Sequence, residues 1–151
     1  MNKIPEEEYK KILEKMPICC VDLVINHAGK VLLVWRNNKP AKDKWWLPGG
    51  RVFKNERIID AALRKGMEEV GIKVKIEKQI GVLETIFDDC PFPDLKTGVH
   101  TINVVYLARP EDDNPKIKID QTIGKYRWID HIEEELDDYV KQMLDKSEVF
   151  K

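Results

Sequence analysis

The stretch GGRVFKNERIIDAALRKGMEEVGI, residues 49–72, joins two glycines to a segment with helical periodicity. The apolar run 45–47 ends at Pro48, and glycine permits backbone conformations that are closed to other residues. We therefore expect a sharp turn at Gly49 and Gly50. The turn would lead the chain into a helix and leave a glycine carbonyl exposed beside it.

The segment after this turn has the signals of a helix. Asn55 is an acceptable N-cap, and Gly71 is a good C-terminal stop. Apolar and small residues recur on one helical face, which we expect to pack on a sheet. They are Ile59, Leu63, Gly66 and Val70.

Charged residues on the same helix suggest a metal site. Arg64 and Glu68 are four residues apart and can pair, while Glu69 projects roughly 100° further round the helix. Glu56 falls in the predicted first turn. Mg²⁺ prefers carboxylate and carbonyl oxygens, so these glutamates beside the Gly49 carbonyl suit Mg²⁺ bound to substrate phosphates. The alternative is that the charges only decorate the solvated face of an amphipathic helix.

The spacing of these charges favours the functional interpretation. From Gly50 the segment reads glycine, five residues, glutamate, seven residues, arginine, three residues, two glutamates, one residue, glycine and an aliphatic residue. Over residues 50–72 this spacing resembles the Nudix box. The resemblance implies an α/β protein, a Nudix-like α/β/α sandwich with a mixed β-sheet, and a hydrolase that uses Mg²⁺, or Mn²⁺ in its place.

The box departs from the family pattern at two positions. The full pattern reads Arg-Glu-aliphatic-any-Glu-Glu, whereas this chain has Arg64-Lys65-Gly66-Met67-Glu68-Glu69. In ordinary Nudix pyrophosphohydrolases the missing glutamate contributes to metal binding or to base catalysis at phosphorus. A cation in its place argues against attack at phosphorus.

Segments outside the box resemble one branch of the family, the GDP-mannose mannosyl hydrolases. The matching segments are Pro-Gly-Gly-Arg at 48–51, Arg36 shortly before Pro40, Phe-Asp-Asp at 87–89 and Tyr-Arg-Trp at 126–128. The resemblance implies hydrolysis of GDP-mannose to GDP and mannose by attack of water on the sugar C1. It also implies a homodimer.

The same resemblance assigns the metal and phosphate ligands. The Gly49 carbonyl and the Glu69 carboxylate are the predicted metal ligands, with Glu68 as a third contributor. Arg36 and Arg51 would hold the leaving diphosphate, because the guanidinium fork suits phosphate oxygens. Both arginines are thereby candidate catalytic residues as well as substrate-binding ones.

The attacking water needs a base, and the expected histidine is missing. In the mannosyl branch it lies in the loop before Tyr-Arg-Trp, but here that loop reads DQTIGKYRW, residues 120–128. His100, at the start of a predicted strand, is the best placed of the three histidines. Asp88, Asp89 and Asp120 remain alternatives.

The connection 87–99 is polar and long for a compact domain, so it is a candidate functional loop that could close over substrate. Its Asp88 and Asp89 are candidate substrate-binding residues. Phe87 and Phe92 could stack on a base or simply pack against the core.

Asp22 is an acidic residue within the apolar run 19–25. Such a residue is costly in a buried strand unless it is paired or faces a wet cavity, which makes it a candidate catalytic residue. The alternative is an edge strand with one face in solvent. The sequence leaves both open.

The rest of the chain completes the predicted fold. The runs 19–25 and 30–35 are typical of a hairpin, and 74–87, 100–108 and 125–129 of further strands. Helical spacing predicts a short helix before Pro17 and a final helix over 132–146. No linker divides the 151 residues, so we predict one domain, 1–151, with an N-terminal helical extension at 1–17.

Composition excludes several classes of partner. The formal net charge is -1 with both signs interspersed, which gives no reason to expect a nucleic acid or a membrane as a partner. The sequence shows neither a bilayer-spanning segment nor a signal core, so we expect a cytoplasmic protein. Its three cysteines form no CxxC pair and no even set.

Two alternatives to the mannosyl hydrolase remain. One is a pyrophosphohydrolase that attacks phosphorus in another nucleoside diphosphate derivative, favoured because Glu68 and Glu69 are both retained. The other is a Nudix-fold module that binds a nucleotide with little or no turnover, favoured by the missing glutamate and the missing loop histidine.

Overall fold

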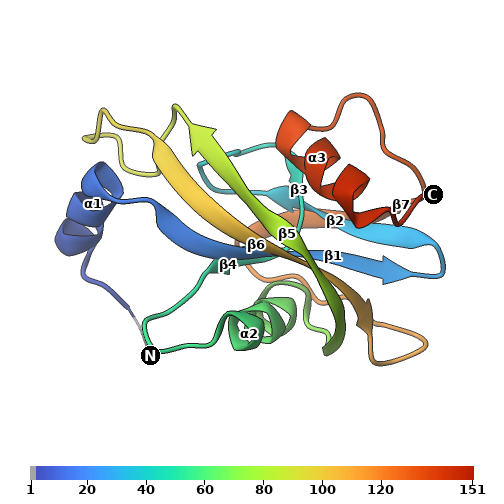
Figure 1. Cartoon of the computed structure of the whole chain (residues 1–151). Coiled ribbons are helices and arrows are strands. Elements are labelled where there is room, and N and C mark those ends of the chain that lie inside the picture. The colour runs from blue at the N-terminus through green and yellow to red at the C-terminus, as the bar shows by residue number, and fades with distance from the viewer. Residues whose placement is uncertain (1–2) are drawn as a thin grey trace.

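The computed structural model describes residues 3–151, so the first two residues of the predicted extension lie outside it. Within these described residues, three helices and seven strands follow one another (Figure 1). They are α1 (Glu6–Lys15), β1 (Ile18–His27), β2 (Lys30–Arg36), β3 (Trp45–Trp46), β4 (Gly49–Arg51), α2 (Ile58–Val70), β5 (Val74–Phe87), β6 (Val99–Pro110), β7 (Ile123–Ile129) and α3 (Asp138–Ser147).

The strands form one mixed sheet. Its order is β3-β2-β1-β6-β5, with β4 also paired to β1 and β7 to β2. The β1–β6 pair is parallel, whereas the β1–β2, β1–β4 and β5–β6 pairs are antiparallel. The predicted hairpin and the three later strands are confirmed, and β5 has the predicted bounds.

Helices cover both faces of this sheet, as the predicted α/β/α sandwich requires (Figure 1). Alternate residues of β1 enter different cores because side chains in a strand point to opposite faces. Leu23 packs in the cluster that contains Ala62 and Val70 of α2. Val24 packs in the cluster that contains Met143 of α3.

The start of α2 differs from the prediction. The helix begins at Ile58, and Asn55 lies before it with a φ of 67°, a left-handed conformation that asparagine tolerates. Glu56 therefore precedes the helix, and its carboxylate accepts a hydrogen bond from the Phe53 N–H at 3.0 Å. The predicted end is confirmed, since Gly71 caps the helix with a φ of 70°.

The buried face of α2 is also rotated from the predicted one. Gly66 and Val70 are buried as expected, but Ile59 and Leu63 are 42% and 39% exposed. The small side chains of Ala61 and Ala62 are buried against the sheet instead. This rotation carries the charged Glu69 onto the buried face as well.

Two further boundaries were predicted wrongly. Gly49 and Gly50 do not form a sharp turn but belong to the strand β4, in which Gly50 pairs with Val21. The final helix begins at Asp138, whose N-cap Asp137 accepts a hydrogen bond from the Tyr139 N–H. The chain before this cap is a succession of bends and turns rather than the predicted helix.

The N-terminal helix α1 packs against the loop between β5 and β6. Leu13 is buried with Ile18 and Val99, and Tyr9 meets Phe92 edge to face with ring centroids 6.2 Å apart. Lys10 Nζ lies 2.9 Å from the Asp94 carboxylate in the loop. In residues 3–151 no helix is long and apolar enough to cross a membrane.

Candidate active site

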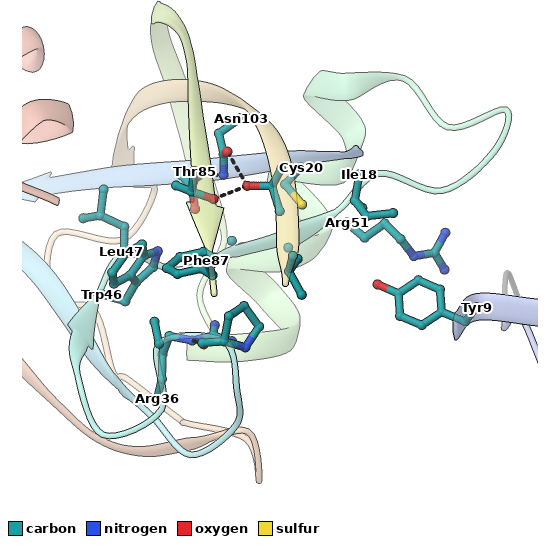
Figure 2. A pocket seen from close by; sticks show the side chains of 17 residues that line it. Tyr9, Ile18, Cys20, Arg36, Trp46, Leu47, Arg51, Thr85, Phe87 and Asn103 are labelled. Carbon is teal, nitrogen blue, oxygen red and sulfur yellow. Dashed lines mark hydrogen bonds between the residues drawn. The ribbon is translucent and has the colours of Figure 1, made fainter. Parts of the chain in front are cut away.

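A cavity of about 160 Å³ opens between α1 and the ends of the central strands (Figure 2). Trp46, Leu47 and Phe87 give it an apolar wall. Figure 2 shows Thr85 and Asn103 on one side of it and Arg51 beside Tyr9 on the other. We call this space the inner cavity, and its polar floor consists of Asp22, Thr85, Thr101 and Asn103.

The polar floor is a single chain of hydrogen bonds. The Thr101 hydroxyl donates to Asn103 Oδ1 at 2.6 Å and therefore accepts from the hydroxyl of Thr85. Asn103 Nδ2 donates in turn to Asp22 Oδ2 at 2.6 Å. The chain fixes the orientation of the Asp22 carboxyl and leaves its Oδ1 toward β4.

Asp22 is only 4% exposed and lies in a strand with neighbours on both sides, so the edge-strand alternative is wrong. Burial, with a smaller contribution from the Glu69 charge, raises the pKa of its carboxyl to about 7. The hydrogen bond from Asn103 and the charge of Arg36 lower the pKa. A carboxyl with this pKa can accept or release a proton near neutral pH.

Gly49 brings the backbone of β4 against Asp22. The two residues are partners in the β1–β4 ladder, and a Cβ at Gly49 would lie 2.6 Å from Asp22 Oδ1 and 2.2 Å from the Val21 carbonyl oxygen. Only glycine fits this approach. The requirement for glycine here is therefore a matter of space rather than of a turn.

Glu69 meets the other side of Gly49. Its carboxylate is buried and accepts a hydrogen bond from the Gly49 N–H at 2.9 Å. In an antiparallel ladder, hydrogen-bonded and non-hydrogen-bonded residue pairs alternate. Leu23 with Pro48 and Cys19 with Val52 are hydrogen-bonded pairs, so the pair of Asp22 with Gly49 is a non-hydrogen-bonded one. The N–H and the carbonyl of Gly49 therefore point away from β1. The carbonyl of Gly49 therefore faces the same side as Glu69.

These donors fit one magnesium ion. A carboxylate and a backbone carbonyl are hard oxygen ligands, and Mg²⁺ completes its shell with water and substrate phosphates. Burial raises the pKa of Glu69, whereas Lys65 and the Gly49 N–H favour its ionised form. Within residues 3–151 no group of three or more His, Cys, Asp or Glu side chains could hold a metal.

Glu68 has different surroundings from Glu69. Both of its carboxylate oxygens accept from Arg64 Nη1, at 3.1 and 3.2 Å. This confirms the predicted pair at four-residue spacing. Arg64 also binds Glu56, with Nε 2.7 Å from Oε2, and donates to the Arg51 carbonyl at 2.9 Å. Arg64 thus ties α2 to the segment that leads out of β4.

The arginines proposed for diphosphate binding both line the inner cavity. Arg36 Nε donates to the Pro40 carbonyl at 2.8 Å, and burial lowers the pKa of its guanidinium while the Glu69 and Asp22 charges raise it. The guanidinium of Arg51 lies 5.9 Å from the ring centroid of Tyr9.

A wider space adjoins the inner cavity and shares Arg36 and Gly49 with it. We call it the outer groove, and its volume is about 670 Å³. Its charged lining residues are mostly basic: they are Arg36, Lys39, Lys42, Lys65 and Glu69. A groove of this charge suits phosphate groups.

The structure does not bring His100 to the inner cavity. Its neighbours in β6, Val99 and Thr101, line the cavity, whereas the His100 ring lies in a separate surface groove with Nε2 2.9 Å from Glu84 Oε2. Asp88 lines that same separate groove.

The other loop aspartates differ in their positions. Asp89 lies close enough to Arg36 for its charge to raise the pKa of that side chain. Asp120 accepts hydrogen bonds from the N–H and the hydroxyl of Thr122, and its own N–H donates to the Glu69 carbonyl at 3.2 Å. Phe87 packs on Trp46 and Phe92 on Tyr9, in agreement with the core interpretation.

Sequence reasoning missed Thr85, Thr101 and Asn103. The signal was present, because these are polar residues inside apolar runs, the same pattern that singled out Asp22. Thr101 and Asn103 are also two residues apart and hence on one face of β6.

Residues 17–146 of the chain match the family model described as NUDIX domain. The low-salt glycan biosynthesis protein Agl8 of Haloferax volcanii is 36% identical over 144 residues, which cover 95% of this chain and 90% of that protein. The ADP-ribose pyrophosphatase of Methanocaldococcus jannaschii is 30% identical over 117 residues, which cover 71% of this chain and 65% of that protein.

Solved structures show a similar fold. The MutT protein of Methanosarcina mazei superposes with a TM-score of 0.71 at 22% identity, over 89% of this chain and 95% of that one. The NUDIX domain of Shewanella oneidensis NrtR, crystallised with ADP ribose, superposes with a TM-score of 0.67 at 22% identity, over 96% and 97% of the two chains.

Proposed function

This chain belongs to the Nudix hydrolase family, and from that membership we propose that it is a magnesium-dependent hydrolase of a nucleoside-diphosphate sugar. The substrate that the resemblance favours is GDP-mannose, and the products are GDP and mannose. The relative named for glycan biosynthesis supports a substrate with a sugar.

The observation that carries this proposal is the position of the inner cavity next to Gly49 and Glu69. Its hydrogen-bonding floor suits sugar hydroxyls, and Trp46 and Phe87 offer an apolar wall for the ring. The basic outer groove suits the diphosphate and the nucleoside beyond it. A nucleoside-diphosphate sugar with its sugar in the inner cavity and its diphosphate in the outer groove would place its C1–O bond near Gly49, which lines both spaces.

In the proposed reaction, water attacks C1 and the bond from C1 to the diphosphate oxygen breaks. Asp22 takes one proton from the water, and the nucleoside diphosphate leaves with the electron pair of the broken bond. Arg36 and Arg51 hold the diphosphate and offset the charge that it gains. Magnesium held by Glu69 and the Gly49 carbonyl would supply further neutralisation of that charge.

Attack at phosphorus is the second candidate function. The name of the Methanocaldococcus jannaschii relative, ADP-ribose pyrophosphatase, favours it, as does the retention of Glu68 and Glu69. Against it stands Lys65, a cation where the family has a glutamate. A nucleotide-binding module without turnover is the third candidate, and the NrtR domain crystallised with ADP ribose is similar in fold.

The test is a screen of nucleoside-diphosphate sugars and ADP-ribose with Mg²⁺, with the products identified by chromatography and mass spectrometry. GDP and free mannose from GDP-mannose are the expected products. GMP and mannose 1-phosphate would support attack at phosphorus instead. Binding without a Mg²⁺-stimulated product from any compound would leave the binding module and overturn the enzyme proposal.

We also propose, from the resemblance alone, that the protein is a cytoplasmic homodimer. Light scattering coupled to size-exclusion chromatography measures its molar mass directly. A mass of about 35 kDa is expected for two copies of the 17.7 kDa chain, whereas a mass near that of one chain would refute the dimer.

A further inference from the structure

Lys65 lies between the two carboxylates of the box. Its Nζ is 3.4 Å from Glu68 Oε2 and 3.7 Å from Glu69 Oε2, and its side chain is only 16% exposed. Each oxygen that it faces belongs to a predicted metal ligand. The ammonium thus stands beside the place where a divalent cation would meet Glu69.

The stem of Lys65 lies across Gly50. A Cβ at Gly50 would lie 2.6 Å from Lys65 Cε and 3.1 Å from its Nζ, so the missing side chain of the glycine leaves the room that the lysine stem occupies. With 16% of its side chain exposed, Lys65 is mostly buried between α2 and β4, and its ammonium lies beside Glu69 rather than in solvent.

Glu69 and Glu68 do not depend on Lys65 equally. Glu68 already has Arg64 on both of its oxygens. Glu69 Oε1 accepts from the Gly49 N–H, and the cation nearest to its Oε2 is Lys65. Because Glu69 is buried, its charge needs nearby positive charge, and the Lys65 ammonium is the stronger of the two sources, ahead of Arg36.

We propose that Lys65 is a tethered cation that competes with a divalent metal for Glu69. This inference rests on the proposed metal site at Glu69 and the Gly49 carbonyl. A divalent ion bound there would be repelled by the ammonium a few ångströms away, or would have to displace it. Lys65 therefore weakens metal binding to the free protein, and its removal strengthens that binding.

The experiment measures Mn²⁺ binding by calorimetry without nucleotide. Lys65→Met keeps most of the stem and removes the charge. Loss of the repulsion between the ammonium and a divalent ion about 4 Å away should raise the affinity of the variant for Mn²⁺ roughly tenfold or more. Lys65→Arg keeps the charge and should stay within about twofold of the wild type. Lys75→Met removes an exposed lysine of β5 and is the matched control, with no expected change.

The opposite result is equally clear. Equal or weaker Mn²⁺ binding by Lys65→Met, with a melting temperature near that of the wild type, would overturn the inference. Should Lys65→Met not fold, Lys65→Gln answers the same question with the same expected tightening. Glu69→Gln separates this inference from the metal site itself. If Glu69→Gln binds Mn²⁺ as well as the wild type, both the metal site and the competition by Lys65 are refuted. If Glu69→Gln loses Mn²⁺ binding but Lys65→Met leaves it unchanged, only the competition is refuted.

Discussion

The inner cavity and the outer groove meet at Gly49 and share Arg36, yet their other polar groups differ. The floor of the cavity carries hydroxyls, an amide and a single carboxyl, whereas the groove adds three lysines, Lys39, Lys42 and Lys65. Asp22 faces Gly49 from the cavity side, and Glu69 faces it from α2. Two acidic groups thus flank one glycine, but only Glu69 has a cation, Lys65, within salt-bridge distance. In the reaction that we propose, proton transfer falls on the cavity side and neutralisation of the phosphate charge on the groove side.

Asp22→Asn breaks the cavity side of this comparison and has the largest expected effect. The amide has the same shape but cannot accept a proton from water, so kcat should fall roughly 1000-fold. Binding of GDP, which we propose to lie in the outer groove, should change less than about threefold. Steady-state kinetics and calorimetry measure the two quantities. A parallel loss of GDP affinity would mean that the two regions do not act separately.

The same substitution changes how stability depends on pH. The pKa of Asp22 is about 7 in the folded protein against an ordinary 3.8, so the unfolded chain binds fewer protons between these values. Its contribution to folding is therefore full below about pH 4 and is lost as the pH rises to about 7. Asp22→Asn lacks this titration and should gain a few kcal/mol relative to the wild type between pH 4 and pH 8.

Urea unfolding of the metal-free proteins at several pH values measures this difference. A constant gap in the free energy of unfolding between wild type and Asp22→Asn would show that burial does not disfavour the charged carboxyl. The cavity side would then lose its distinguishing feature.

Glu69→Gln breaks the groove side, with a smaller expected effect. Glutamine still accepts the hydrogen bond from the Gly49 N–H, so the fold should persist, but a charged metal ligand is lost. We expect Mg²⁺-dependent turnover to fall roughly 100-fold. The neighbouring Glu68→Gln is the control, since Glu68 is already occupied by Arg64, and its loss should stay below about tenfold. Equal losses would place both glutamates in the same role.

His100→Ala has the smallest expected effect and sharpens the boundary of the site. The ring lies outside the inner cavity and beside Glu84, so turnover should change less than about twofold. The measurement is kcat/KM under the conditions used for Asp22→Asn. A loss of 100-fold or more would move the base to His100 and refute the role proposed for Asp22.

Hydrophobic patterning was sufficient to predict most of the fold. The alternating apolar runs predicted the β1–β2 hairpin and the bounds of β5, because these strands depend on their own side-chain pattern. The N-cap of α2 was wrongly assigned to Asn55. Residues 53–56 form their own turn before the helix, in which the Glu56 carboxylate accepts from the Phe53 N–H, and such a turn contains the same residue types as a helix cap. The face of α2 was misjudged because small residues allow closer packing than the larger Ile59 and Leu63.

The site was less accessible to prediction from sequence. Gly49 and Glu69 could be named from the box, but the place of Lys65 against Gly50 depends on contact between a helix and a strand. The hydrogen-bond chain from Thr85 to Asp22 joins β5 and β6 to β1, which is distant from both in sequence. The position of His100 at the start of β6 suggested that it reaches the site. Side chains of a strand alternate between its two faces, so Thr101 and Asn103 point to the cavity and His100 points to the other face.

The central claim is that water attacks the sugar carbon rather than phosphorus. Hydrolysis of GDP-mannose in ¹⁸O-labelled water tests it most directly, with mass spectrometry of both products. We predict that the label enters free mannose and that GDP carries none. Label confined to a phosphate-bearing product would contradict the claim.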